Sequence, residues 1–168
     1  MRRIHRLFLS LTALVVAAPV ILIGCGSKDP QALTNEGMSA MNGGDAKAAL
    51  VAFDGALAAM DATHPEYMRA AVGRCQALAR IDPAKGAADF LALAKANPTR
   101  IKDQDFHVVV SEYVRVRKFT DAVRMMYEGN VMFPTSEKML KIKEAVIAES
   151  KKANDAEAIK ALKGIGYL

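Results

Sequence analysis

The sequence predicts an all-α domain arranged as a stack of antiparallel helical hairpins. The first observation behind this prediction is that apolar residues recur at helical spacing, as in Leu50, Phe53 and Leu57. The second is that helix-breaking residues separate these patterns: Gly43 ends an early helical pattern and Pro98 ends a later one. The third is that no segment shows two alternating strands joined by a tight turn. A chain of 168 residues, 52% hydrophobic and 24% charged, suits one compact domain with an appendage.

Residues 1–24 have the pattern of a signal peptide. Residues 1–6 are short and basic, and residues 7–23 contain no charged side chain. The apolar run is short for a membrane span and is interrupted by Pro19. Basic residues ahead of such a run keep that end in the cytoplasm, so the pattern predicts export of the rest of the chain. The alternative is an uncleaved signal anchor.

The leader ends on a sequence that resembles the bacterial lipobox. In Leu22-Ile23-Gly24-Cys25, an aliphatic residue, a tolerant position and a small residue precede a cysteine. The resemblance implies cleavage between Gly24 and Cys25, a diacylglycerol on the Cys25 thiol and acylation of the new N-terminus. Acyl chains contribute about 0.8 kcal/mol per buried methylene, and several of them hold a protein on a membrane without a spanning helix.

The lipobox resemblance implies a lipoprotein of the bacterial cell envelope, on the periplasmic side. Residues 25–30 are then a lipidated N-terminus with a short tether, and residues 31–168 form the helical domain. Gly26-Ser27 lacks the aspartate that signals inner-membrane retention in some bacteria, which favours the outer membrane. The net charge of +5 falls to about +2 without the three leader arginines. This balance does not provide the concentrated basic face that nucleic-acid binding needs.

A repeat pattern is found at the start of the predicted helical domain. Gly37 is followed by a Gly-Asp break and then by Ala49, Phe53 and Ala56. The segment resembles a tetratricopeptide repeat, in which a small residue of the first helix faces two alanines of the second. Antiparallel helices cross closely only where the side chains at the crossing are small, and Phe53 fills the gap beside them.

The pattern recurs with spacings of 38, 35 and 36 residues between second-helix alanines, close to the family period of about 34. In the second copy Cys75 replaces Gly37, and the second helix carries Ala87, Leu91 and Ala94. The third copy has Tyr113 on its first helix and Ala122, Met126 and Gly129 on its second. A partial fourth copy uses Ala158, Leu162 and Ile165. The resemblance implies a stack of three to four repeats covering nearly all of the mature chain.

In this family the inner, concave surface comes from the first helix of each pair. Carried over position by position, the inner surface of this chain comprises Met38, Met41, Asn42, Arg69, Gln76, Arg80, His107, Ser111 and Arg115. Three arginines on successive first helices favour an acidic partner segment. The alternative is a solvated surface on which these arginines point in different directions.

Motifs of catalysis and metal binding are missing from the sequence. His5, His64 and His107 are scattered without a second ligand at helical spacing, so no metal site is expected. The chain has no P-loop, no dinucleotide fingerprint and no nucleophile elbow, and no cofactor is expected. A disulfide between Cys25 and Cys75 is arithmetically possible, but Cys75 fits a small buried hydrophobe.

Taken together, these features predict a non-enzymatic, membrane-anchored module that binds a protein or peptide in its concave groove. The alternative is a small structural subunit of an envelope complex that contacts its neighbours by its convex face or its ends. An apolar or basic lining of the groove favours the first hypothesis. A polar groove with an apolar terminal face favours the second.

Overall fold

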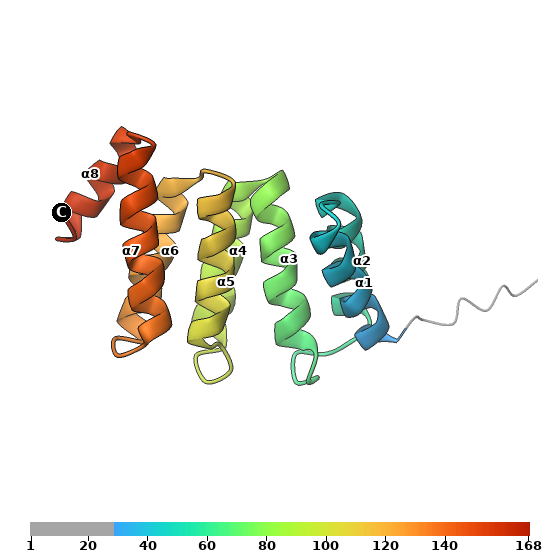
Figure 1. The fold of residues 1–168 in the computed structure, drawn as a ribbon. Helices are drawn as coiled ribbons and strands as arrows, with labels where there is room; N and C mark the ends of the chain where they lie inside the picture. Colours follow the sequence, from blue (N-terminus) through green and yellow to red (C-terminus); the bar gives the residue numbers. More distant parts are fainter. Residues whose placement is uncertain (1–28) are drawn as a thin grey trace, which may run out of the picture.

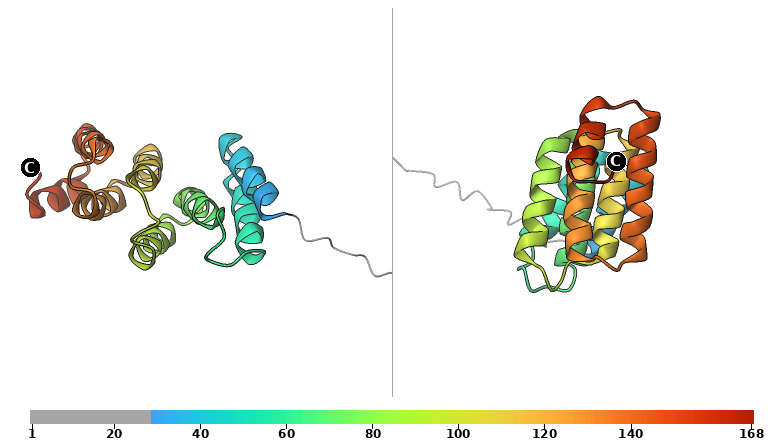
Figure 2. Two further views of the ribbon diagram at one scale, coloured as in Figure 1. Left: turned by 90° about the horizontal axis from the view of Figure 1, so that it is seen from below. Right: turned by 90° about the vertical axis from the view of Figure 1, so that its left-hand side faces the viewer.

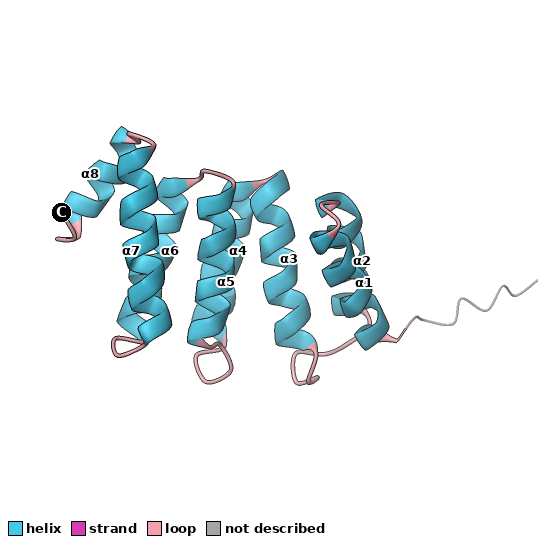
Figure 3. Cartoon of the chain, viewed as in Figure 1, coloured by secondary structure: helices cyan, strands magenta, loops and turns pink. Residues whose placement is uncertain are grey.

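The computed structural model describes residues 29–168, and this part of the chain forms eight helices and no strand (Figures 1 and 3). The helices are α1 (Pro30–Asn42), α2 (Ala46–Ala58), α3 (Tyr67–Ile81), α4 (Pro83–Ala96), α5 (Asp103–Arg115), α6 (Phe119–Met132), α7 (Glu137–Lys152) and α8 (Ala156–Gly164). The predicted all-α class is confirmed. The predicted leader, with Gly24 and Cys25, lies outside the described residues.

Local sequence signals explain where the helices begin and end. Asp45 caps α2 by accepting a hydrogen bond from the Ala48 backbone at 2.9 Å, and Asp82 caps α4 just ahead of Pro83. Gly44 has φ +87°, a left-handed conformation that suits glycine in the tight turn between α1 and α2. The run of valines at 108–110 lies within α5.

Consecutive helices pair as antiparallel hairpins, and the hairpins stack side by side (Figure 1). The first helices of the pairs contact one another in the order α1, α3, α5, α7, and α4, α6 and α8 do the same on the other side. Seen from below, α3, α5 and α7 form one row, α4 and α6 form the other, and the first hairpin is inclined to both (Figure 2, left). The arrangement places a continuous row of first helices along one side of the domain.

The hydrophobic core is divided at α3. A small cluster joins the first hairpin to α3 and consists of Met41, Ala49, Phe53, Ala56, Ala70 and Ala77. A larger cluster runs from α3 to α8 and includes Phe90, Phe106 and Tyr113. Helix α3 therefore uses one face for the first hairpin and another for the rest of the domain.

Most of the residues predicted to pack the repeats are buried. This holds for Gly37, Ala49, Phe53, Ala56, Cys75, Ala87, Ala94, Tyr113, Ala122, Met126, Gly129, Ala158 and Leu162. Leu91 and Ile165 are only partly buried.

The predicted register of the second copy needs a correction at Leu91. Phe90, which is fully buried, takes the central place in α4 instead. The reason is helical phase: Phe90 follows the buried Gly86 by four residues, just as Phe53 follows Ala49. The closest approach in this hairpin is therefore made at Gly86 and not at Ala87. A Cβ on Gly86 would lie 2.9 Å from the Leu78 Cβ on α3.

Candidate functional site

A hollow lies along the row of first helices. It has a volume of about 560 Å³ and is lined by residues of α1, α3 and α5 and of the two connections beneath them. We call it the α1–α3–α5 groove. Its floor consists of the apolar side chains of Met38, Met68, Val72 and Val108, together with Gly73. Three of the predicted inner-surface residues, Met38, Arg69 and Gln76, line this groove.

The rim of the groove is polar and mostly basic. Arg69, Arg100 and Lys102 supply cations, Gln76 and Gln104 supply amides, and Asp105 supplies the acid. Arg69 lies 3.1 Å from Glu66, so its charge is partly compensated. The groove can thus bury apolar side chains on its floor and offer hydrogen-bond donors at its edges, which is the usual composition of a site for an organic or peptide ligand.

Two rim residues also stabilise the structure around the groove. The Arg100 guanidinium donates hydrogen bonds to the backbone carbonyls of Ala62 and His64 and lies over the Tyr67 ring. It thereby fastens the connection between α2 and α3. The Asp105 carboxylate accepts from the Lys102 backbone at 2.8 Å and caps α5. Burial raises the pKa of Asp105, and the backbone hydrogen bond only partly opposes this shift.

A buried carboxylate, Glu112, organises the neighbouring end of the row. Its side chain is 8% exposed and lies 2.6 Å from Arg80 on α3 and 2.5 Å from Arg115 on α5. Arg80 also donates to the Met41 carbonyl at the end of α1, at 3.0 Å. One ionic cluster therefore ties together three successive first helices. Burial alone would raise the pKa of Glu112, but the hydrogen bonds from Arg115 and Arg80 outweigh it and lower the pKa.

The expectation of a free basic stripe formed by Arg69, Arg80 and Arg115 is wrong. Arg80 and Arg115 converge on Glu112, and Arg69 pairs with Glu66. Arg69 and Arg80 both lie on α3 and Arg115 lies on α5, and two of these arginines neutralise a buried acid of their own chain. The prediction of a basic surface considered the arginines alone and left out Glu112, which precedes Arg115 by three residues. The cationic part of the rim comes instead from the connection after α4, through Arg100 and Lys102.

Replacing Glu112 by glutamine tests this ionic cluster. Glu112→Gln keeps the shape of the side chain but removes its charge, and we expect a loss of about 1–2 kcal/mol in the free energy of unfolding at pH 7. Because the folded-state pKa is lowered, the stabilisation by Glu112 is present above its unfolded value and is lost as the pH falls through the folded one. Urea unfolding at several pH values should therefore show the wild type and the variant converging as the pH falls below the usual pKa of a glutamate, about 4.3. A constant difference down to pH 2 would contradict this role.

The remaining predicted inner-surface residues lie outside the groove. Met41 is buried beneath Arg80, Asn42 is exposed at the end of α1, and His107 and Ser111 are half-buried on α5. None of these four lines the groove. Sequence reasoning also missed the floor residues Met68, Val72 and Val108, because an apolar residue on a helix predicts core as readily as a binding surface.

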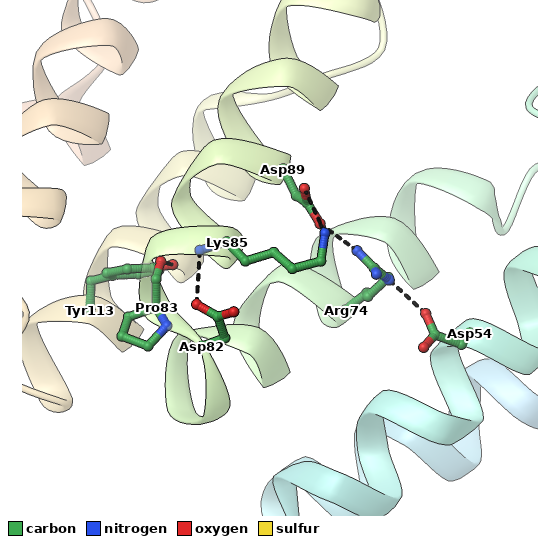
Figure 4. A network of polar contacts seen from close by, with 7 residues as sticks. All are labelled: Asp54, Arg74, Asp82, Pro83, Lys85, Asp89 and Tyr113. Atoms are coloured by element: carbon green, nitrogen blue, oxygen red, sulfur yellow. Dashed lines mark hydrogen bonds and ion pairs between the residues drawn. The ribbon is translucent and has the colours of Figure 1, made fainter.

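A second polar network joins the first two hairpins through α2, α3 and α4 (Figure 4). Arg74 on α3 lies 2.6 Å from Asp54 on α2 and 2.7 Å from Asp89 on α4. Lys85 also pairs with Asp89, at 3.1 Å. Burial alone would lower the pKa of Arg74, but its hydrogen bonds to the two aspartates raise it. The network holds the hairpins together, and Arg74 and Asp89 also line a smaller hollow of about 360 Å³.

The thiol of Cys75 is unreactive in the folded protein. The residue is 3% exposed, and burial raises its pKa to about 12. A thiol in such a setting stays protonated at neutral pH and reacts slowly.

The fold and the groove together define a helical-hairpin stack with a peptide-sized hollow on its first-helix side. Across residues 29–168, no cluster of histidine, cysteine and acidic side chains is arranged to hold a metal ion. Within the same range, no helix has the length and apolar character required to cross a bilayer. No protein-family model, characterised protein or solved structure matches the chain.

Proposed function

We propose that this protein is a lipid-anchored, non-enzymatic interaction module of the bacterial envelope that binds an extended segment of a partner protein in the α1–α3–α5 groove. The observation that carries the proposal is the groove itself, with its apolar floor and its basic and amide rim. Tetratricopeptide-like architecture is part of the proposal. It is supported by the stacked antiparallel hairpins and by the small residues buried between them.

The groove favours a partner segment that carries an apolar anchor near an acidic group. Met38, Met68 and Val108 present flexible or branched apolar surface, and methionine adapts to differently shaped side chains. Lys102 is exposed at the rim, where an acidic group of the partner would meet it. Attraction of this kind is screened over about 8 Å at physiological ionic strength. Binding should therefore weaken as salt is added.

Site-specific photo-crosslinking in intact cells tests the groove. A photoreactive residue at Arg69 or Gln104 should capture one and the same partner, and one at Lys95 on the far side of α4 should not. Met68→Glu, which puts a charge on the apolar floor, should abolish capture, and a thermal melt checks that the variant stays folded, since Met68 also packs against the core. Equal capture from Lys95, or capture that survives Met68→Glu, would contradict groove binding.

Lipidation at Cys25 is tested separately. The lipobox resemblance of Leu22 to Cys25 supports it, and these residues precede α1 by only a few positions. Cys25→Ala should leave an unprocessed precursor without acyl chains, whereas the wild type should show the mass of a triacylated or diacylated Cys25. An unmodified Cys25 behind an intact leader in the wild type would overturn the anchor.

The alternative of a structural subunit in an envelope complex also has an observation in its favour. The outer face of the first hairpin is apolar and exposed, with Val51 74% accessible. This exposed apolar face favours an interface at the first-hairpin end of the stack, in addition to the groove.

A further inference from the structure

The outward face of the first hairpin carries an apolar hollow that α3 to α8 leave uncovered. Its volume is about 540 Å³, and its lining residues all come from α1 and α2: Leu33, Glu36, Lys47, Ala48, Val51, Ala52 and Gly55. Val51 has the highest exposure among the large hydrophobic residues of residues 29–168. The end hairpins of repeat stacks require a polar outer face for solubility. This end departs from that requirement, which indicates that another surface covers it.

The charge of the chain is distributed unequally along the stack. Residues 29–66, which contain the first hairpin, hold one basic side chain, Lys47, and six acidic ones: Asp29, Glu36, Asp45, Asp54, Asp61 and Glu66. Residues 67–168 hold eighteen basic and twelve acidic side chains. The segment that contains the first hairpin is therefore acidic, although Asp54 and Glu66 pair with Arg74 and Arg69 of α3, and the remainder of the domain is basic.

The opposite end of the stack supplies a complementary surface. Helix α8 lies at the far end from α1 (Figure 1) and carries Lys160 and Lys163, both exposed. Leu168, which ends the chain, is 41% exposed. Residues 137–168 contain seven lysines and five acidic residues. This end thus combines a small excess of basic side chains with exposed apolar area.

We propose that a second copy of this chain covers the apolar face of the first hairpin with its α8 end, so that the stacks join head to tail. Two first hairpins would repel each other in a symmetric contact, because both are acidic. Contact between the acidic end of one copy and the basic end of another is favoured by charge and buries Val51 and Leu33. Because the two contacting surfaces differ, the arrangement can propagate from copy to copy.

The area of a single hairpin end makes this a weak contact. A stable interface usually needs about 800 Å² from each partner, more than two short helices present at their outer face. The association should therefore depend on the local density of the protein and on salt. For this reason the test is made with the full chain in the cells that produce it.

Cysteine crosslinking identifies the two surfaces. Cells that produce both Val51→Cys and Leu168→Cys chains, treated with a short bifunctional maleimide, should yield a dimer joined between these positions. The wild-type chain controls for Cys25 and for the buried Cys75. Lys160→Glu combined with Lys163→Glu on the Leu168→Cys chain should remove the crosslinked dimer, whereas Lys95→Glu combined with Lys118→Glu should not.

Each outcome decides the proposal. A Val51–Leu168 dimer that is lost only with the α8 charge reversals supports it. A dimer from Val51→Cys chains alone would overturn it in favour of a symmetric contact. A crosslink from Val51→Cys to a different protein would assign the face to another partner. The absence of any crosslink at either end would also overturn it, whatever the outcome for the groove or for Cys25.

Discussion

Phe53→Ala is expected to lower the free energy of unfolding by about 3–5 kcal/mol, the range for removing a fully buried phenylalanine. The Phe53 ring fills the space between two glycines, and a Cβ on Gly37 or Gly73 would lie within 2.6 Å of it. Among the described residues, it is also the only aromatic one in the small cluster that joins the first hairpin to α3. Removing the ring leaves a cavity beside Gly37 and Gly73, which have no side chain with which to fill it.

Hydrogen exchange of a protein starting at residue 26 localises the effect. In Phe53→Ala, the amides of α1 and α2 should lose protection, while those of α5 to α7 keep theirs. The matched control is Phe133→Ala, since Phe133 is only half-buried and belongs to the larger cluster. That variant should leave α1 and α2 protected. Uniform loss of protection along the whole chain in Phe53→Ala would contradict a core divided at α3.

Gly86→Ala is expected to destabilise the domain although it replaces a glycine inside a helix. A Cβ at Gly86 would lie 2.6 Å from the Tyr113 hydroxyl oxygen and 3.2 Å from the Ala79 backbone nitrogen. Tyr113 donates from this position to the Pro83 carbonyl at 2.6 Å, and its ring is fully buried (Figure 4). Such overpacking costs about 1–3 kcal/mol. The gain in helix propensity, up to about 1 kcal/mol, offsets only part of it.

Gly55→Ala is the control for this prediction. Gly55 also lies within a helix, but a Cβ there would meet the Leu33 Cδ1 at 3.6 Å, an ordinary contact. We expect this variant to gain about 0.5–1 kcal/mol from helix propensity alone. Urea unfolding of both variants should therefore give shifts of opposite sign. A stabilised Gly86→Ala variant would mean that α3 and α4 separate more readily than their contacts indicate.

Much of the fold could be predicted because its signals are local. Asp45, Asp82 and Pro83 mark helix starts through interactions with backbone atoms one turn away, and the structure shows these caps. The register of α4 was less predictable. Leu91 and Phe90 are both large and apolar, and only the contact of Gly86 with α3 decides which of them turns inward.

The candidate site was less predictable than the fold because it depends on pairs of residues far apart in the sequence. Arg80 and Glu112 are 32 positions apart, and their contact removes Arg80 from the surface that the arginines were expected to form. Gln76 and Met38, both predicted for the inner surface, line the groove, since a stack of first helices brings those faces together. The contribution of Arg100 and Lys102 could not be inferred, because both come from a connection whose path follows no helical period.

The divided core has a mechanical consequence. If the protein is held at its N-terminal end and pulled through a ligand in the groove, the load crosses from the first hairpin to α3. That junction consists of the small cluster around Phe53, of one contact each from Arg74 and Arg80, and of two hydrogen bonds from Arg100 to the connection before α3. The first hairpin should peel away before α3 to α8 unfold, and Met38 would leave the groove with it. Under the proposed function, tension at the anchored end would therefore release the bound segment before the rest of the domain unfolds.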